Sequence, residues 1–471
     1  MTKKPFLLFL ILATVCASRL QAQSLAINTT GSTADASAIL DVTSSNKGIL
    51  IPRVALTASN VAAPLTAPVA SLLIYNTATA GTVPDNVIPG YYYWTGAQWT
   101  RLINGGTGNN DQWNLLGNGG TVDGTNFIGT TDNVPLNFKM NNLKAGRISI
   151  VNEESFFGIE AGKNNTTGAG STFFGYNAGR SNTTGNYNTG SGDSALFANT
   201  TGGFNTALGG WSLISNTTGS YNTAIGLNSL KSNTTGFSNT ALGIETLNKN
   251  TTATNLVAVG DSSLFNNTTG PGNTAIGSKA LYMNNIGDSN TAVGYRALYS
   301  NTTGEWNTAV GESALRSNTT GVNNTGIGQQ SLLSNTTGFE NTGVGQYSLL
   351  SNLTGSRNTA IGSSALSSNI SGIHNVAIGP YSLTSNSSGN LNVAIGSFSL
   401  STNTTGGSNT AIGYWSMVKN TTGSNNTATG RQAMYNNTTS TSNTANGYQA
   451  LYSDTTGSYN TALGRQAMYS N

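Results

Sequence analysis

The chain has 471 residues, of which 59 are glycine and only 8% are charged, and its net charge is +3. Aliphatic and aromatic residues recur throughout, which argues against a disordered chain. Nucleic acids and anionic membranes are recognised by clustered Lys and Arg, so a charge this small and dispersed predicts neither as a partner. The composition also differs from that of an ordinary soluble enzyme.

The first 22 residues have the three parts of a secretory signal peptide. Lys3 and Lys4 form a positive segment, residues 6–16 are apolar, and Leu20-Gln21-Ala22 offers a cleavage site. The apolar run is too short for a comfortable membrane span. Cleavage after Ala22 would remove the one cysteine, so we expect an exported protein without disulfides, located at the cell surface, in the outer membrane or outside the cell.

Two small β modules are predicted before the main body of the chain, an N-terminal one over residues 23–104 and a connector over residues 105–150. In the first, "ASAILDVTSSNKGILIPRVALT" predicts two short strands, and "GYYYWTGAQWTRL" predicts a hairpin that turns at Thr95-Gly96. We expect Trp94 and Trp99 to pack locally, and a contact role is the alternative. The second module is defined by "NFIGTTDNVPLNFKMNNLKAGRI".

Residues 151–471 repeat with a period of 17. The glycine of "NTAIG" recurs at every step, and the glycine of "NTTG" keeps the same period from Gly168 to Gly457, replaced only by Ala253 and Ser440. An unbroken period over some three hundred residues predicts a solenoid in which each repeat is one coil. The structural turn glycines of the first kind include Gly158, Gly175, Gly209, Gly226, Gly243, Gly277, Gly311, Gly362, Gly413 and Gly464.

Each coil is predicted to be a β-structure. Two glycines and several Asn and Thr argue against a helix, whereas "TAIG" and "SL" predict two short strands separated by the turn "SNTTG". Neighbouring coils would lie about 4.8 Å apart. Glycine suits the turns because it takes positive φ without cost. Stacked asparagines would hydrogen-bond along the axis as a ladder, at Asn216, Asn233, Asn301, Asn318 and Asn335.

The alternation in residues 222–226 places Thr223 and Ile225 on one side and Ala224 on the other. We expect Ile225 and Leu230 to fill the coil and the small Ala224 face to lie against another chain. Two buried aliphatics per coil make a thin core, which favours an oligomer that shares its core, most simply a homotrimer. A monomeric roll is the alternative.

The motifs "NTAIGSKAL", "NTAVGYRAL" and "NVAIGPYSL" resemble the head repeats of trimeric autotransporter adhesins. In that family, similar "SVAIG" motifs form a left-handed parallel β-roll, and three rolls pack about a common axis. The resemblance covers about two-thirds of the chain, but the period is longer than usual there, and no stalk or barrel anchor is visible. The two preceding modules resemble those of secreted bacterial fibre proteins and phage-tail-fibre-like proteins.

The sequence offers little for catalysis, and we expect no enzyme activity, no cofactor and no metal. His374 is the single histidine, so neither a histidine triad nor a multi-histidine metal site can form. Its repeat position holds Tyr221, Ser238 and Arg357 in other coils, as a tolerant surface position would. No glycosidase-type carboxylate pair stands out among Asp193, Glu245, Asp261, Glu312 and Glu340. A glycan-active β-solenoid enzyme is the remote alternative.

One row of aromatic residues is a candidate contact surface. Stacked outward, it would suit a host or environmental glycan or protein, and a packed or inter-chain face is the alternative. Ice binding is not expected, because the paired threonines lie in the turn instead of alternating on the strand. The row consists of Tyr282, Tyr299, Tyr435, Tyr452 and Tyr469.

The predicted function is therefore that of an exported cell-surface fibre or adhesin, whose repetitive β-roll acts as a projecting rod and a multivalent surface. The alternative is a tail-fibre-like receptor-binding rod. Asn471 falls where the next "NTTG" should begin, whereas a solenoid normally ends in a cap. We expect an anchor, chaperone or tip to follow, and membrane contact only through such an anchor.

Overall fold

The computed structural model describes residues 24–102 and 127–470, and the chain divides into two units, residues 1–128 and 129–471. The predicted signal peptide lies outside the described residues. Within the described ranges every regular element is a β-strand, which confirms the all-β prediction. Those ranges contain no helix that could cross a membrane.

The N-terminal unit contains a strand pair and a four-stranded sheet. In the pair, β1 (Leu25–Asn28) runs parallel to β2 (Leu40–Thr43). The sheet consists of β3 (Arg53–Val54), β4 (Leu73–Asn76), β5 (Gly90–Trp94) and β6 (Trp99–Arg101), with β3 parallel to β4 and the other pairs antiparallel.

The β5–β6 hairpin turns at the predicted place, where the Thr95 N–H donates to the Gln98 carbonyl at 2.9 Å. The core of this sheet is one cluster of buried aliphatic and aromatic side chains. Trp94 and Trp99 are both buried there, with ring centroids 5.0 Å apart. The sheet thus holds both rings away from solvent.

The second unit begins with an antiparallel hairpin of β7 (Leu136–Met140) and β8 (Leu143–Ser149). Its turn residues Asn141 and Asn142 have φ of 45° and 64°, the left-handed geometry that tight hairpins favour. Strand β8 is hydrogen-bonded antiparallel to β9 (Glu154–Phe157), the first strand of the repeat region. Residues 136–149, which the sequence places in a connector, therefore cover the first edge of the solenoid.

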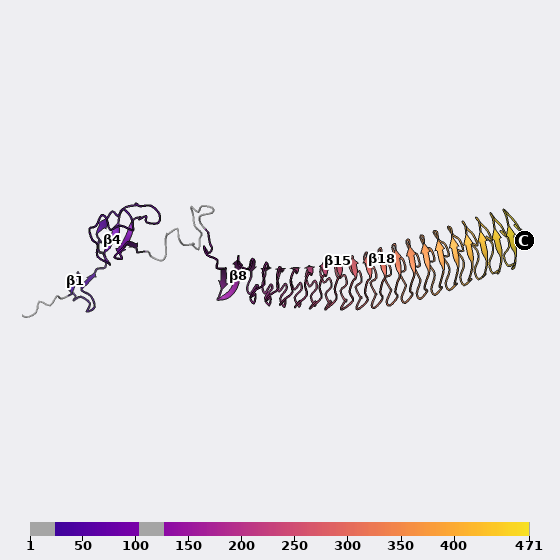
Figure 1. Cartoon of the computed structure of the whole chain (residues 1–471), viewed down its shortest axis with the longest axis horizontal. Helices are drawn as coiled ribbons and strands as arrows, with labels where there is room; N and C mark the ends of the chain where they lie inside the picture. The colour runs from indigo at the N-terminus through magenta and orange to yellow at the C-terminus, as the bar shows by residue number, and fades with distance from the viewer. Residues whose placement is uncertain (1–23, 103–126, 471) are drawn as a thin grey trace, which may run out of the picture. The chain divides into compact units, whose positions relative to one another are not determined.

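The repeat region is a parallel β-solenoid, as predicted. Strands β9 to β27 stack in one row (Figure 1), and each residue pairs with the one 17 positions later, as Thr223 does with Thr240 and Ala224 with Ala241. After β9, the strands are β10 (Thr172–Phe174), β11 (Thr189–Ser191), β12 (Thr206–Leu208), β13 (Thr223–Ile225), β14 (Thr240–Leu242), β15 (Val257–Val259), β16 (Thr274–Ile276), β17 (Thr291–Val293), β18 (Thr308–Val310), β19 (Thr325–Ile327), β20 (Thr342–Val344), β21 (Thr359–Ile361), β22 (Val376–Ile378), β23 (Val393–Ile395), β24 (Thr410–Ile412), β25 (Thr427–Thr429), β26 (Thr444–Asn446) and β27 (Thr461–Leu463).

Each coil has one strand instead of the two predicted. The "SL" segment is a series of turns, because Asn228 and Leu230 have φ of 58° and 49°, and these left-handed residues cannot form an extended strand. The same geometry recurs in coil after coil. The backbone N–H groups of each turn donate hydrogen bonds to the next coil, as the Leu230 N–H does to the Thr246 carbonyl at 2.9 Å.

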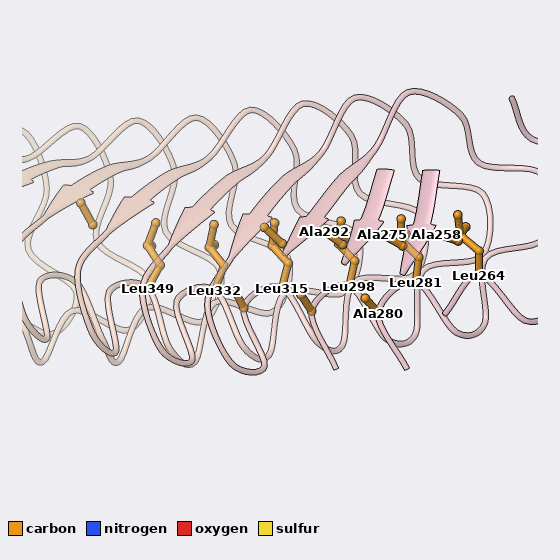
Figure 2. Packing of buried hydrophobic residues seen from close by; sticks show 14 of the residues in the cluster. Ala258, Leu264, Ala275, Ala280, Leu281, Ala292, Leu298, Leu315, Leu332 and Leu349 are labelled. Atoms are coloured by element: carbon orange, nitrogen blue, oxygen red, sulfur yellow. The ribbon is translucent and has the colours of Figure 1, made fainter. Parts of the chain in front are cut away.

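The prediction of which strand face is inside was wrong. Ala224 and Leu230 are both fully buried, whereas Ile225 is half-exposed. Figure 2 shows the leucines of successive coils lined up inside the solenoid beside the strand alanines. Alternation fixes which residues share a face but not which face is inside. Ala224 and Leu230 together fill the interior of the coil, and the aliphatic residue that ends the strand, Ile225, points outward.

Candidate interaction surfaces of the solenoid

The predicted turn glycines lie directly after the strands, with φ between +115° and +136°. At Gly226, an added Cβ would lie 2.4 Å from the carbonyl oxygen of Gly243 in the next coil. These glycines are therefore required both for their backbone conformation and for the close approach of the coils. They set the stacking distance and carry no ligand-binding chemistry.

The "NTTG" positions require glycine for a different reason. Gly236 does not have a positive φ, but an added Cβ would lie 2.4 Å from Asn233 Oδ1. Where alanine replaces this glycine at position 253, the Asn250 Nδ2 bond to its carbonyl lengthens to 3.3 Å. The next ladder bond, from Asn267 Nδ2 to Asn250 Oδ1, is also 3.3 Å. Space, and not positive φ, selects glycine here, and a methyl group stretches the ladder.

The asparagines of "NTTG" form a buried ladder along the axis. Asn216 Nδ2 donates to Asn199 Oδ1 at 2.7 Å and to the carbonyl of Gly219 at 2.9 Å, and Asn233 Nδ2 donates to Asn216 Oδ1 at 2.8 Å. Each amide thus joins two coils and closes its own turn. The structure places three other residues in this ladder in the same way, Asn301, Asn318 and Asn335.

A second asparagine ladder was missed by sequence reasoning. Asn222 Nδ2 donates to Asn205 Oδ1 at 3.1 Å and to the Gly236 carbonyl at 2.9 Å, and both asparagines are buried. The signal was present, because the asparagine of "NTA" keeps the 17-residue period. The wrong face assignment placed Asn222 outside together with Ala224. Buried amides with all these partners make the stack rigid.

The first coil replaces this asparagine by a buried carboxylate, Glu154. Arg147 from β8 forms an ion pair with it at 2.7 Å, and Asn165 Nδ2 donates to its other oxygen at 2.7 Å. Lys144 Nζ donates to the Gly162 carbonyl at 2.8 Å. Burial, and then the charge of Arg147, lowers the pKa of Lys144 to about 8. The hairpin therefore closes the first end of the solenoid with charged groups.

The outward side of the stacked strands is uncharged and consists of one row rich in threonine and one aliphatic row. In every strand from β12 to β24, the two outward side chains are a Thr or Val and then a branched aliphatic, as Thr223 and Ile225 are in β13. We call this surface the strand face. Its aliphatic row is Leu208, Ile225, Leu242, Val259, Ile276, Val293, Val310, Ile327, Val344, Ile361, Ile378, Ile395 and Ile412. A continuous exposed apolar surface of this kind marks an interaction site.

The predicted tyrosines form two rows instead of one. Tyr282 stacks between Phe265 and Tyr299 with centroids 5.3 Å apart on each side. Toward the C-terminus, a second row is formed by Tyr435, Tyr452 and Tyr469, with centroids 5.1 and 5.0 Å apart. We call these the turn rows, because they lie on the turns that follow the buried leucines.

Each turn row begins at a lysine. Lys249 Nζ lies 5.4 Å from the ring centroid of Phe265, and Lys419 Nζ lies 5.3 Å from that of Tyr435. These distances suit a cation–π contact. Burial, and then the neighbouring tyrosines, raises the pKa of Tyr452. The rows thus present ring edges, hydroxyls and a cation together.

The candidate catalytic residues are not brought together. His374 is exposed beside the strand. Glu340 forms an ion pair with Arg357 at 2.9 Å, and Glu312 accepts from Gln329 Nε2 at 3.0 Å. In residues 24–102 and 127–470, no three His, Cys, Asp or Glu side chains are grouped so that they could hold a metal ion.

These features describe a β-solenoid of fibre-like build, with its conspicuous chemistry spread along surfaces instead of concentrated in a cleft. Residues 26–116 match the family model described as a phage tail like trimerisation region. The match supports self-association of the chain as a homotrimer, and it does not single out the autotransporter adhesins. Neither the curated proteins nor the solved structures contain a significant match to this chain.

Proposed function

We propose that this chain forms an exported homotrimeric fibre whose solenoid is a projecting, non-catalytic adhesive rod. The observation that carries the proposal is the combination of a trimerisation region at residues 26–116 with an unbroken solenoid that follows it in the sequence. The exported location rests on the signal-like residues 1–22.

The rod is suited to hold a surface at a distance. Successive coils are joined by the strand ladder, by two buried asparagine ladders and by turn hydrogen bonds such as that from the Thr217 N–H to the Thr234 carbonyl at 2.9 Å. All of these bonds run along the axis, so bending the rod must stretch many of them together.

The turn rows are the proposed adhesive surface, and their ligand is a glycan or a protein. Aromatic edges and hydroxyls beside a lysine can contact a sugar or a peptide with weak affinity. Three chains that each carry two rows would raise the avidity by effective concentration, without any single strong site.

The test is binding of the full-length chain to a glycan array and to cell surfaces. Tyr299→Ala and Tyr452→Ala together should reduce binding in steps, with one row lost in each single variant. Ser367→Ala, at the corresponding turn position of a coil without an aromatic residue, is the matched control. Unchanged binding in the double variant would contradict the adhesive role of the rows. Glycan cleavage abolished by one carboxylate substitution would instead favour the enzyme alternative.

A second candidate is a rod that only spaces a separate receptor-binding part, as in a tail fibre. The description of the matched region favours it. In that case the double tyrosine variant binds normally, and receptor binding does not map to the solenoid at all.

A further inference from the structure

The coils around the second turn row carry positive charge without carboxylate partners. After Glu340, the sequence has one carboxylate side chain, Asp454, which is buried and accepts from the Gly457 N–H at 2.7 Å. The other charged residues after position 400 are three exposed cations, and none of them forms an ion pair with the described residues. These cations are Lys419, Arg431 and Arg465.

Two of the cations belong to a column in which tyrosine and arginine alternate. We define the arginine column as the residues that directly follow the strand glycine in four successive coils, Tyr414, Arg431, Tyr448 and Arg465. The guanidinium carbon of Arg431 lies 5.8 Å from the ring centroid of Tyr414, and that of Arg465 lies 5.9 Å from the ring centroid of Tyr448. Both tyrosines are exposed. The two arginines are two coils apart, which is about 10 Å along the axis.

A ladder of glutamines lies next to the arginine column. In three successive coils the residue after the column position is glutamine, and Nε2 of each later glutamine donates to Oε1 of the one before, at 3.0 and 3.1 Å. In the preceding coil this position holds Trp415, whose ring centroid is 4.6 Å from that of Tyr414 and 6.1 Å from that of Tyr435. Trp415 thus joins the column to the second turn row. The ladder consists of Gln432, Gln449 and Gln466.

The strand face also changes at these levels. Its aliphatic row runs to Ile412, and the next two coils carry Thr429 and Asn446 at the same position. Asn446 is exposed and Thr429 is half-buried. The surface around Arg431 is therefore polar on its strand side and bears tyrosine rings on its turn side.

The first turn row has the same rings but a different charge beside it. In both rows the lysine donates to an asparagine of the next coil at 2.9 Å. The position that carries Arg431 and Arg465 in the second set of coils holds Asp261 and Glu312, and no cation, in the coils of the first row. An anionic ligand would therefore be favoured at the second row and repelled by these carboxylates at the first.

The spacing of the two arginines indicates how charge is spaced in the ligand. Guanidinium groups bind carboxylates through paired N–H donors, so carboxylates about 10 Å apart would suit Arg431 and Arg465. An extended polysaccharide with one carboxylate in each disaccharide repeats its charge over about this length. Its sugar rings and hydroxyls also suit aromatic rings and amides. Duplex DNA has one negative charge per about 1.7 Å of axis, which is far denser than these cations.

We infer that the arginine column, the glutamine ladder and the second turn row together bind an acidic polysaccharide that lies along the solenoid axis, with one carboxylate at Arg431 and the next at Arg465. This inference rests on the proposed adhesive role of the second turn row and names the class of its ligand. Tyr435 and Tyr452 contact the sugars, and Lys419 supplies a third cation. Affinity then comes from many weak contacts along one polymer.

The test compares binding of the full-length chain to a hyaluronan decasaccharide and to its carboxyl-reduced form, by titration calorimetry. Hyaluronan has one carboxylate in each disaccharide, and reduction removes the charge but keeps the sugars. We expect the acidic form to bind about tenfold more tightly, because two exposed charge pairs are lost with the other form. Arg431→Gln with Arg465→Gln should remove this difference. Lys279→Gln with Arg316→Gln, which changes the net charge equally, should keep it.

Equal binding of the two forms to the unmodified chain, equal losses in the two double variants, or no binding of hyaluronan would each overturn the inference. Tighter binding of single-stranded DNA through the same arginines would also overturn it, because the surface would then be a nucleic-acid site. The proposed function is judged separately by Tyr299→Ala with Tyr452→Ala. If that variant loses binding to cells while the hyaluronan test fails, the adhesive role stands and only the acidic ligand is wrong.

Discussion

The four-stranded sheet β3–β6 and the solenoid are both β-structures, but they hold their cores in different ways. The sheet gathers Leu56, Ile74, Val87 and three aromatic residues around one centre, from segments with no common spacing. In most coils the solenoid adds a strand alanine and a leucine or methionine, each to a neighbour 17 residues away. The sheet thus has one compact core, whereas the core of the solenoid is a row in which each side chain packs against those of the adjacent coils.

This difference predicts different responses to substitution. In a centred core, each large side chain contacts most of the others, so the loss of one weakens the whole unit. In a linear stack, a coil contacts only the coils above and below, so damage is local and the rest of the stack persists.

Trp99→Ala should destabilise the N-terminal sheet by about 3–5 kcal/mol, because it removes a buried ring that packs on Trp94. Since this sheet lies within the matched trimerisation region, the trimer should weaken as well. Denaturation followed by near-ultraviolet circular dichroism measures the first effect, and light scattering the second. An unchanged unfolding midpoint in the variant would show that the stability of the sheet does not depend on one shared core.

Asn301→Ala should destabilise the middle of the solenoid by about 3 kcal/mol, because Asn284 Oδ1 and the Gly304 carbonyl lose their donor and Asn318 Nδ2 loses its acceptor. Hydrogen exchange should increase in the coils around residue 301 and stay unchanged at distant coils. Thr303→Ala, an exposed position in the same turn, is the control. Faster exchange along the entire solenoid would contradict local damage.

Gly311→Ala should cost about 1–3 kcal/mol, because φ is +128° and the Cβ would lie 2.7 Å from the backbone of Gly328. Gly321→Ala should cost less, because its position already holds alanine at residue 253, where the ladder stretches to accept it. Thermal denaturation of the two variants gives the comparison. Equal losses would mean that space alone, and not φ, decides both positions.

The smallest effect is the pH dependence of the β7–β8 cap. The pKa of Lys144 is about 8 in the folded chain and 10.5 in an exposed lysine, so the unfolded chain binds more protons between these values. Stability of the cap should therefore rise as pH increases from about 8 to 10.5, and the penalty should be fully present below pH 8. Lys144→Met should remove this rise in stability, measured as the protection of the β8 amides against hydrogen exchange. An unchanged pH dependence in the variant would assign it to another group.

The 17-residue period was enough to predict the solenoid, its parallel register and the alignment of equivalent residues such as Asn216 and Asn233. A strict sequence period predicts a regular stack, because each coil repeats the geometry of the preceding one. Leu230 could also be assigned to the interior, because leucine or methionine recurs at its repeat position from Leu196 onward.

The orientation of the strand could not be predicted from the period. Alternation places Thr223 and Ile225 on the same face of the strand, but it does not show which face points inward. That choice depends on the path of the rest of the coil, which turns sharply where Asn228 and Leu230 have positive φ. Leucine rarely adopts a left-handed backbone conformation, so its residue type gives no indication of the positive φ at Leu230.

We propose that three copies of this chain form one fibre. Its most direct test is the mass of the full-length chain measured by light scattering in non-denaturing solution over a range of concentrations. We expect three times the mass of one chain, with no change on dilution. A mass equal to one chain, or one that changes continuously with concentration, would contradict it.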